Sequence, residues 1–279
     1  MSPTEVRDLA DVLALHPLLP TAWRAAGGAG RFLRDERPAL LDVDTKSSPT
    51  DSVTVMDRTA EAMILAELLG ARPTDGMLGE EGGERLGTSG VRWVVDPLDG
   101  TVNYLFRLPM WGVSIAAEEQ GIVTVGVVAT PEYDESYVAV RGAGAWRVSG
   151  SRAERLDVSR CDDLSEALVT TGFGYAAAMR RSQSAVVTGL ITEIRDVRRM
   201  GAAVIDFCWL ARGRVDAYFE KGLNAWDYAA GALIAQEAGA VVTGLRGGDF
   251  SEFVVAAAPG IHAGLRSALV ALDADADPA

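Results

Sequence analysis

Two aspartates that follow a short apolar run have the residue type and spacing to bind a divalent metal ion. Asp96 and Asp99 stand in the segment Asp96-Pro97-Leu98-Asp99-Gly100-Thr101, directly after the apolar residues 91–95. The carboxyl end of a strand is where α/β proteins usually place their chemistry. Carboxylates spaced i and i+3 around a proline-containing turn can converge on one side, with the Leu98 carbonyl as a further hard donor. Alone, the segment could also be a strand-ending turn with surface aspartates.

Three further acidic segments accompany this turn, at residues 51–57, 79–82 and 226–227. Taken singly, each is explained by a solvated loop or a helix cap, Asp227 by an N-cap position at the positive end of a helix dipole. Together they favour a pair of metal ions, because two ions about 3.5–4 Å apart need several carboxylates. Hydrolysis of a phosphate monoester is extremely slow unless metal ions generate hydroxide and screen charge. The pattern therefore predicts a divalent-metal phosphatase.

Composition narrows the classes of partner. The net charge is −13, from 26 basic and 39 acidic residues, and no basic stripe is present that could neutralise phosphates. We therefore expect no nucleic-acid or membrane partner, and a two-metal nuclease is disfavoured on the same ground. An anionic small-molecule substrate would need bound cations that invert the local field. Since neither a signal peptide nor a membrane span is evident, we expect a cytoplasmic protein.

The periodicity of apolar residues predicts an α/β fold, an α+β layered sandwich. The 279 residues can form one large domain or two tightly joined halves. We expect two helical pieces within residues 6–33, a mainly antiparallel sheet between residues 92 and 140, alternating helices and strands afterwards, and a fraying acidic tail. The later helices are expected at residues 202–211, 226–237 and 261–272, and the later strands at residues 215–219 and 253–257.

The acidic segments resemble those of the inositol monophosphatase family. The resemblance is closest to bacterial members that include the actinobacterial inositol-1-monophosphatases. It implies an αβαβα sandwich like that of fructose-1,6-bisphosphatase, with one catalytic domain over residues 1–279 and halves of about 1–165 and 166–279. It is carried by Lys46-Ser47-Ser48-Pro49-Thr50-Asp51, Asp57, Gly79-Glu80-Glu81, residues 96–101, Gly201-Ala202-Ala203 and residues 220–231.

The resemblance also implies a cofactor and catalytic roles. Two Mg²⁺ ions are implied, with a third and weaker one near Glu80. Glu80, Asp96 and the Leu98 carbonyl would bind the first, and Asp96, Asp99 and Asp227 the second. Glu80 and Thr101, supported by Asp57, would orient and deprotonate a metal-bound water for in-line attack on phosphorus, without a phosphoenzyme.

The implied substrate is myo-inositol 1-phosphate, and the resemblance further implies inhibition by Li⁺ and a homodimer. Gly100 and Thr101 would hold the phosphate at a helix start, and Glu220 would bind a sugar hydroxyl. Gly201, Ala202 and Ala203 would line the same pocket, where Ala202 replaces a hydroxyl residue of many relatives.

Three alternatives remain open. A histidinol-phosphate phosphatase, or another small sugar or nucleotide phosphatase, would use the same fold and the same metal chemistry. A non-catalytic, metal-stabilised interaction protein would lack at least one of the implied ligands. None of those ligands is missing from the sequence.

Overall fold

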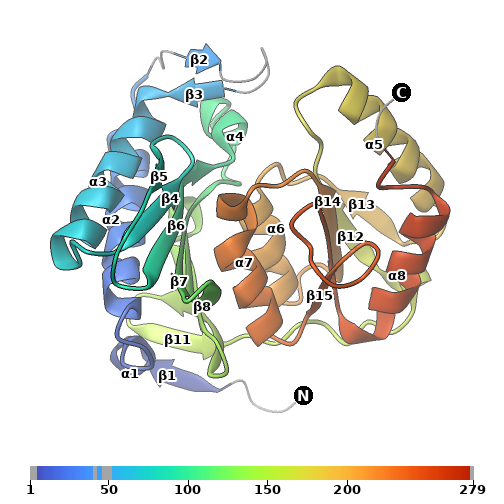
Figure 1. Cartoon of the computed structure of the whole chain (residues 1–279). Coiled ribbons are helices and arrows are strands. Elements are labelled where there is room, and N and C mark those ends of the chain that lie inside the picture. Colours follow the sequence, from blue (N-terminus) through green and yellow to red (C-terminus); the bar gives the residue numbers. More distant parts are fainter. Residues whose placement is uncertain (1–4, 40–42, 46–51, 277–279) are drawn as a thin grey trace.

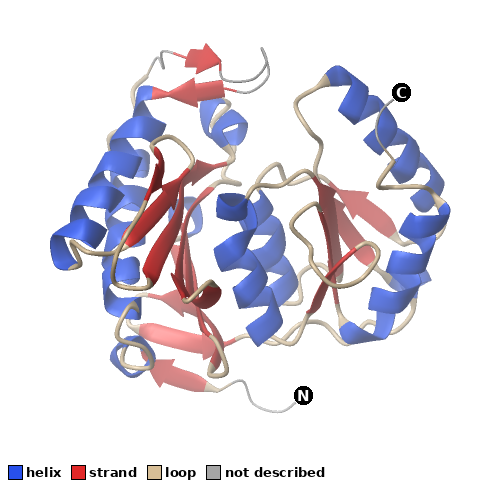
Figure 2. Cartoon of the chain, in the orientation of Figure 1, coloured by secondary structure: helices blue, strands red, loops and turns tan. Residues whose placement is uncertain are grey.

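Helices and sheets alternate in five layers (Figures 1 and 2). The structure, a computed structural model, describes residues 5–39, 43–45 and 52–276, so the motif at residues 46–51 lies outside the described part. Two helices cover one face of a large sheet, two lie between the sheets, and two cover the outer face of the second sheet. In that order the helices are α2 (Leu19–Asp35) with α3 (Val55–Ala71), α6 (Ala203–Ala211) with α7 (Ala225–Glu237), and α5 (Ala177–Leu190) with α8 (Pro259–Ala271). The predicted αβαβα sandwich is confirmed.

The first sheet has nine strands in the order β1-β11-β10-β9-β8-β7-β6-β4-β5. All neighbouring pairs are antiparallel except β4 and β6, which run parallel. Because carboxyl ends of parallel strands meet at one edge, the residues after β4 and at the end of β6 lie together. The strands are β1 (Val6–Asp8), β4 (Gly76–Gly79), β5 (Gly83–Arg85), β6 (Val91–Asp99), β7 (Gly112–Glu119), β8 (Ile122–Thr130), β9 (Glu135–Val140), β10 (Gly144–Ser149) and β11 (Arg152–Arg155).

The second sheet has five strands in the order β13-β12-β14-β16-β15. Its first three strands in that order run parallel, so their carboxyl ends also share one edge. The strands are β12 (Leu168–Thr171), β13 (Asp196–Arg198), β14 (Ala217–Lys221), β15 (Val241–Gly244) and β16 (Phe253–Ala257). The remaining elements are α1 (Leu9–Leu13), α4 (Thr101–Leu105), two single-turn 3₁₀ helices at Pro131–Tyr133 and Leu164–Glu166, and a short hairpin of β2 (Val43–Thr45) with β3 (Ser52–Thr54).

The two central helices are apolar around most of their circumference, as helices between two sheets must be. Small residues let them approach their neighbours closely. A Cβ on Gly126 of β8 would lie 2.9 Å from the carbonyl oxygen of Ala230 in α7, and one on Gly231 would lie 2.7 Å from the ring of Phe207 in α6. These contacts bring α7 close to the large sheet and to α6.

Three expectations need correction. Residues 6–33 contain the predicted two helices, but they begin with a strand, β1, which pairs with β11 at the sheet edge. The described part of the acidic tail does not fray, because Arg246 binds the Asp275 carboxylate through two hydrogen bonds of 2.9 Å. Asp227 is not the N-cap of α7: Asn224 is the cap, and Asp227 is the third helical residue.

Both cysteines are free, and Cys208 is buried. In the described part of the chain, no helix is long and apolar enough to cross a membrane.

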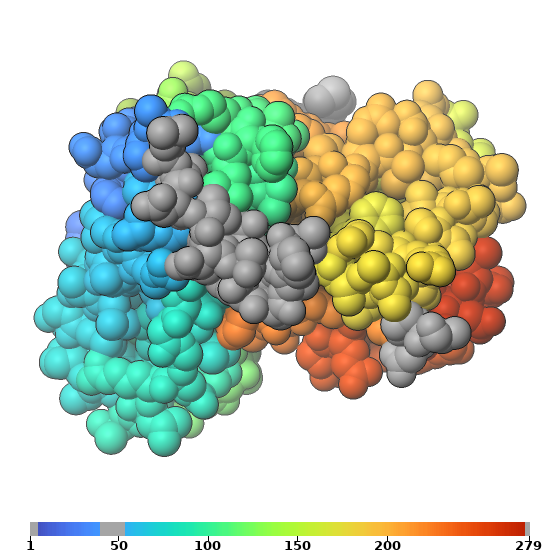
Figure 3. Space-filling model, turned by 90° about the horizontal axis from the view of Figure 1, so that it is seen from above, coloured from blue at the N-terminus to red at the C-terminus, as the bar shows by residue number. Residues whose placement is uncertain are grey.

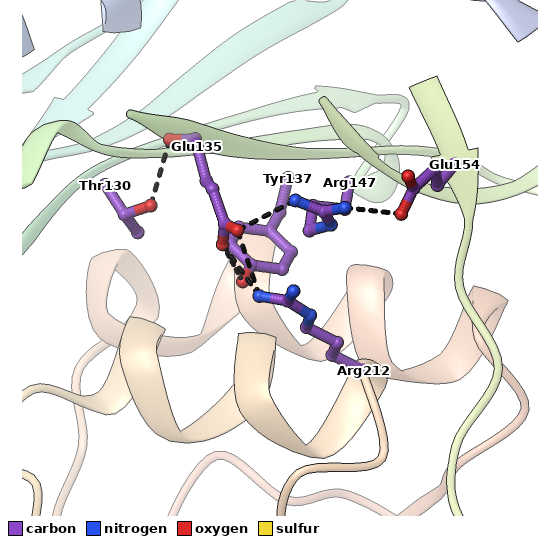
Figure 4. Close-up of polar contacts among 6 residues, drawn as sticks. All are labelled: Thr130, Glu135, Tyr137, Arg147, Glu154 and Arg212. Carbon is purple, nitrogen blue, oxygen red and sulfur yellow. Dashed lines mark hydrogen bonds and ion pairs between the residues drawn. The ribbon is translucent and has the colours of Figure 1, made fainter. Parts of the chain in front are cut away.

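A polar cluster joins the large sheet to the end of α6 (Figure 4). Glu135, the first residue of β9, accepts hydrogen bonds from Arg147 at 2.8 Å and from Arg212 at 2.9 and 3.0 Å. The hydroxyl of Tyr137 donates to the same carboxylate at 2.9 Å. Arg212 caps the carboxyl end of α6. One carboxylate thus connects the sheet layer to the central helical layer.

Replacing Arg212 tests the contribution of this connection. We expect Arg212→Met to lower the free energy of unfolding by about 1–2 kcal/mol, because Glu135 loses a charged partner while the packing of the side-chain stem is kept. Urea unfolding measures the change, with Arg181→Met on the exposed side of α5 as the control. Equal stability of the two variants would show that the cluster is energetically neutral.

Candidate functional site

A cavity of about 450 Å³ opens where the strand ends of both sheets meet the starts of α6 and α7. Figure 3 views the molecule from above: the segment near residue 105 (green) borders the segment near residue 200 (orange), and the segment near residue 175 (yellow) lies beside it. The lining residues include predicted residues from both halves of the chain. These are Glu80, Asp99, Gly201, Ala202, Ala203, Glu220 and Asp227.

The parallel pairing of β4 and β6 brings Glu80 to the aspartate turn. The backbone N–H of Glu80 donates to the Val95 carbonyl at 3.2 Å. The side chain of Asp96 is buried, and its Oδ1 accepts from the Leu98 N–H at 2.9 Å. Between Asp96 and Asp99 the register with β7 shifts, which turns the end of β6 toward the cavity. The structure thus brings Glu80 next to the turn that carries Asp96 and Asp99.

Asp99 and Asp227 are each fixed by a backbone N–H group. Asp99 Oδ2 accepts from the N–H of Val204, in the first turn of α6, at 2.7 Å. Asp227 Oδ2 accepts from the N–H of its own helix cap, Asn224, at 2.6 Å, so it serves as a cap partner and lines the cavity as well. Both carboxylates lie at helix starts, where the helix dipole favours negative charge.

Thr101 and Asp57 form a hydrogen-bonded pair beside this turn. The Thr101 hydroxyl lies 3.0 Å from Asp57 Oδ1 and 3.0 Å from the Leu98 carbonyl, the two acceptors for its proton. Asp57 is buried in the first turn of α3, where Oδ2 accepts from the N–H of Thr54 at 2.9 Å and completes a capping box. The acceptor of the Thr101 proton is thus held rigidly.

Gly100 precedes α4 with φ of +92°, a conformation that favours glycine. A Cβ at this position would lie 2.9 Å from the Met110 carbonyl and 3.0 Å from the Cβ of Ala202. Gly201 also has a positive φ, of +88°. Asn103 supports the backbone next to it, because its side-chain N–H₂ donates to the Met200 carbonyl at 2.8 Å and to that of Met110 at 2.6 Å.

The acidic residues raise one another's pKa values. Burial raises the pKa of Asp96 well above its usual range, and the charges of Glu80, Asp99 and Asp227 add to the effect. Burial also raises the pKa of Asp99, with the charge of Asp227 as the next cause. The pKa of Asp227 rises to about 7, mainly through burial. Hydrogen bonds from Val204 to Asp99 and from Asn224 to Asp227 lower these pKa values in part.

This donor set fits Mg²⁺ by its chemistry. Carboxylate and carbonyl oxygens are the ligands that hard divalent cations prefer, and a cation would supply the missing positive charge. As the side chains stand, no three His, Cys, Asp or Glu residues within the described ranges are grouped so that they could hold a metal ion.

Sequence reasoning missed three residues near Glu220: Arg199 and Asp206, which line the cavity, and Tyr218 behind them. Tyr218 is fully buried and donates to Glu220 Oε2 at 2.7 Å. Arg199 is exposed on the cavity wall, and its charge lowers the pKa of Glu220 while burial raises that pKa. Asp206 is buried, and its Oδ1 has no hydrogen-bond partner among the described residues. Of these three residues, only Asp206 could have been noticed in the sequence, because it is the one charged residue in the apolar helix α6.

Comparison with known proteins identifies the family. The model of the inositol monophosphatase family matches residues 14–275. The chain belongs to this family. Inositol-1-monophosphatase of Mycobacterium bovis is 40% identical over 269 residues, which cover 90% of this chain and 93% of that protein. The Nus factor SuhB of Escherichia coli is 40% identical over 242 residues, which cover 84% of this chain and 87% of that protein.

Solved structures agree with this assignment. The structure of Mycobacterium tuberculosis SuhB, 38% identical, superposes with a TM-score of 0.79 and covers 96% of this chain and 98% of its own. The suhB suppressor protein of Bartonella henselae, 36% identical, has a TM-score of 0.85 and covers 91% of this chain and 98% of its own. The predicted family, fold and enzyme class, an inositol-phosphate phosphatase, are confirmed.

Asp99 is the residue whose replacement best separates function from folding. We expect Asp99→Asn to abolish phosphatase activity and to keep or raise the melting temperature in metal-free buffer, because one repelling charge is removed while the amide oxygen can still accept from Val204. Turnover at saturating Mg²⁺ and thermal melting in EDTA measure the two effects. Exposed Asp162→Asn is the control. Near-normal turnover of Asp99→Asn would refute its assignment as a metal ligand.

The raised pKa values predict how Mg²⁺ stabilises the fold. Carboxylates whose folded pKa lies above the unfolded value stabilise the metal-free fold at low pH, and this stability is lost as pH rises through the folded pKa, about 7 for Asp227. Mg²⁺ should therefore raise the melting temperature more at about pH 8 than at about pH 6.

Melting curves with millimolar Mg²⁺ or EDTA at both pH values, with KCl at matched ionic strength, measure this difference. An equal shift at both pH values, or none, would contradict a single cation site made by these carboxylates.

Proposed function

We propose that this protein is a Mg²⁺-dependent phosphomonoesterase that hydrolyses myo-inositol 1-phosphate by direct attack of water, without a phosphoenzyme. The observation that carries the proposal is the hydrogen bond between Thr101 and Asp57. It lies beside the carboxylates of Asp96 and Asp99, whose pKa values are raised by burial and by neighbouring charges. A surface turn would neither bury these carboxylates nor hold a hydroxyl among them.

Glu80, Asp96, the Leu98 carbonyl, Asp99 and Asp227 are the residues that would hold the metal ions. Mg²⁺ bound there would screen the phosphoryl charge and make water acidic enough to attack at neutral pH. A third ion near Glu80 stays a prediction from the resemblance.

The protein's own groups would orient the attacking water. Thr101, while it donates its proton to Asp57, keeps an oxygen lone pair with which it can accept a hydrogen bond from water. Glu80, which follows the parallel neighbour strand β4, would take the second proton of that water. Asp57 would act only through Thr101, because its other oxygen is engaged by Thr54.

The phosphate would lie at the start of α4. Gly100 turns the chain so that the N–H groups of Thr101 and the next residue begin a helix, and such groups bind phosphate oxygens well. The carboxylates beside this point would repel a phosphate that arrives without cations. Substrate binding and metal binding should therefore depend on each other.

The leaving-group alcohol would lie against Glu220 and the backbone of Gly201, Ala202 and Ala203. The half-buried carboxylate of Glu220 can accept a hydrogen bond from a sugar hydroxyl. Ala202 has no hydroxyl, so this segment offers only its backbone groups. The alternative substrate, histidinol phosphate, would bring an ammonium group to a wall that bears both Glu220 and Arg199, so charge alone does not separate it from an inositol phosphate.

The net charge of −13 disfavours a nucleic-acid or membrane partner, so the proposed partner is a small-molecule phosphate monoester. The name Nus factor belongs to the enterobacterial relatives. The homodimer, the cytoplasmic location, inhibition by Li⁺ and a single catalytic domain with halves that divide near residue 165 stay predictions.

A turnover assay on four phosphates tests the proposal. Inositol 1-phosphate, histidinol phosphate, fructose 1,6-bisphosphate and adenosine 3′,5′-bisphosphate are compared at equal Mg²⁺, with EDTA as the metal-free control. We expect the highest kcat/KM for inositol 1-phosphate and no turnover in EDTA. Higher efficiency on any other phosphate would assign the substrate differently, and full activity in EDTA would overturn the metal mechanism.

Glu220→Gln tests contact with the alcohol. A charge-assisted hydrogen bond contributes roughly 1.5–3 kcal/mol, so kcat/KM on inositol 1-phosphate should fall by about ten- to a hundredfold. A nitrophenyl phosphate, which lacks the sugar hydroxyls, should be hydrolysed at a nearly unchanged rate. Exposed Glu252→Gln is the control. An equal loss on both substrates would place Glu220 with the phosphate or metal groups instead.

A further inference from the structure

The carboxylate of Glu220 occupies the space in which a side chain on Gly172 would begin. A Cβ built on Gly172 would lie 2.0 Å from Glu220 Oε2 and 2.1 Å from both Cδ and Oε1. Non-bonded heavy atoms normally stay about 3.5 Å apart or more. The backbone of Gly172 does not itself require glycine, because its φ is outside the left-handed region. The carboxylate would have to shift if residue 172 carried a side chain.

The order of the strands in the second sheet creates this contact. β12 and β14 are parallel neighbours in which Thr171 is paired with Phe219. Gly172 and Glu220 follow at the same carboxyl edge, although 48 positions separate them in the sequence. The side chain of Glu220 can therefore reach across the end of the neighbouring strand.

A hydrogen bond fixes the carboxylate from a second side. The Tyr218 hydroxyl donates to Glu220 Oε2 at 2.7 Å, since residues two apart on a strand point to the same face. The ring of Tyr218 is fully buried and packs edge-on against Phe207 of α6, with ring centroids 4.9 Å apart. A ring held in this way cannot swing aside. Its hydroxyl also favours the ionised carboxylate, because it lowers the pKa of Glu220 against the effect of burial.

We propose that Gly172 and Tyr218 are positioning residues that set the place of the Glu220 carboxylate in the cavity and thereby determine specificity for the leaving-group alcohol. Gly172 acts by leaving room, and Tyr218 acts by donating a hydrogen bond. The inference rests on the proposed function in one respect, the contact between Glu220 and the alcohol.

A double-mutant cycle tests the role of Gly172. In the wild-type background, Gly172→Ala should lower kcat/KM on inositol 1-phosphate by about tenfold, mainly through KM, and should change hydrolysis of a nitrophenyl phosphate by less than about twofold. In the Glu220→Ala background the same substitution should cause no further loss, because the added methyl group meets no carboxylate. Losses that add in the double variant would overturn the inference.

Tyr218→Phe is the second arm of the test. It keeps the ring and removes the hydroxyl, so kcat/KM on inositol 1-phosphate should fall by about three- to tenfold, again without loss on the nitrophenyl phosphate and without further loss in the Glu220→Ala background. If Gly172→Ala does not fold, as judged by thermal melting, this cycle decides the outcome. Additive losses in the Tyr218→Phe cycle would overturn the role of Tyr218.

Two control variants match these changes outside the cavity. Tyr137→Phe removes the hydroxyl of another buried tyrosine that donates to a glutamate two residues away on its strand (Figure 4). Gly28→Ala adds a methyl group in α2 at a point where no atom lies within 4 Å. Both should keep the wild-type preference for inositol 1-phosphate. The same loss of preference in Tyr137→Phe would contradict a local effect at Glu220.

The design separates failure of this inference from failure of the proposed function. If the effects of Gly172→Ala and Glu220→Ala are coupled but kcat/KM falls equally on both phosphates, Gly172 positions Glu220, and Glu220 does not contact the alcohol. A selective loss in Glu220→Ala without coupling would keep the alcohol contact and reject the positioning role.

Discussion

Repulsion among buried carboxylates is the physical constraint on which the rest of the structure depends. Burial raises the pKa values of Asp96, Asp99 and Asp227, and the charges of neighbouring carboxylates raise them further. Such an arrangement costs stability unless a cation binds. Helix starts and the backbone N–H groups of Val204 and Asn224 offset part of that cost. A cation bound among these carboxylates, as proposed above, would offset the rest of that cost.

The central helices connect this site to the layers around it. The start of α6 donates to Asp99 from Val204, and Arg212 at its other end binds Glu135 of the large sheet. Its buried flank also packs Phe207 against Tyr218 of the second sheet. One helix thus contacts Asp99, Tyr218 and the sheet that carries the aspartate turn. A change in the packing of α6 should therefore alter the positions of residues on both sides of the cavity.

Local chemistry made part of the site predictable from the sequence. The aspartate turn, the helix start after Gly100 and the first-turn position of Asp57 follow from residue types within a few positions of one another. The family resemblance added Glu80, Asp227 and Glu220, which local patterns alone explain as loop, cap and strand residues. The strand β1 was missed because three residues give no usable alternation, and it forms only through pairing with β11.

Contacts that depend on strand order could not be predicted. Nothing in the sequence says that Gly172 will stand beside Glu220, since this requires β12 and β14 to be parallel neighbours. The ion pair of Glu135 with Arg212 spans 77 positions and depends on the way α6 crosses the large sheet. Asp227 was expected as the N-cap of α7, but Asn224 is the cap and Asp227 is the third helical residue. Which of the two residues caps the helix depends on backbone dihedrals. The burial of Asp206 could have been predicted, because it is a charged residue within an apolar helix.

Proton release on metal binding measures the central constraint most directly. Burial and neighbouring carboxylates raise the pKa values of Asp96 and Asp99 and bring that of Asp227 to about 7, so a cation that binds these groups should displace protons. Calorimetric titration of metal-free protein with Mg²⁺ at about pH 7, in two buffers of different ionisation enthalpy, counts these protons. We expect net proton release in the wild type and a smaller release in Asp99→Asn. Binding of Mg²⁺ with no proton release in either protein would contradict the view that repelling carboxylates form one cation site.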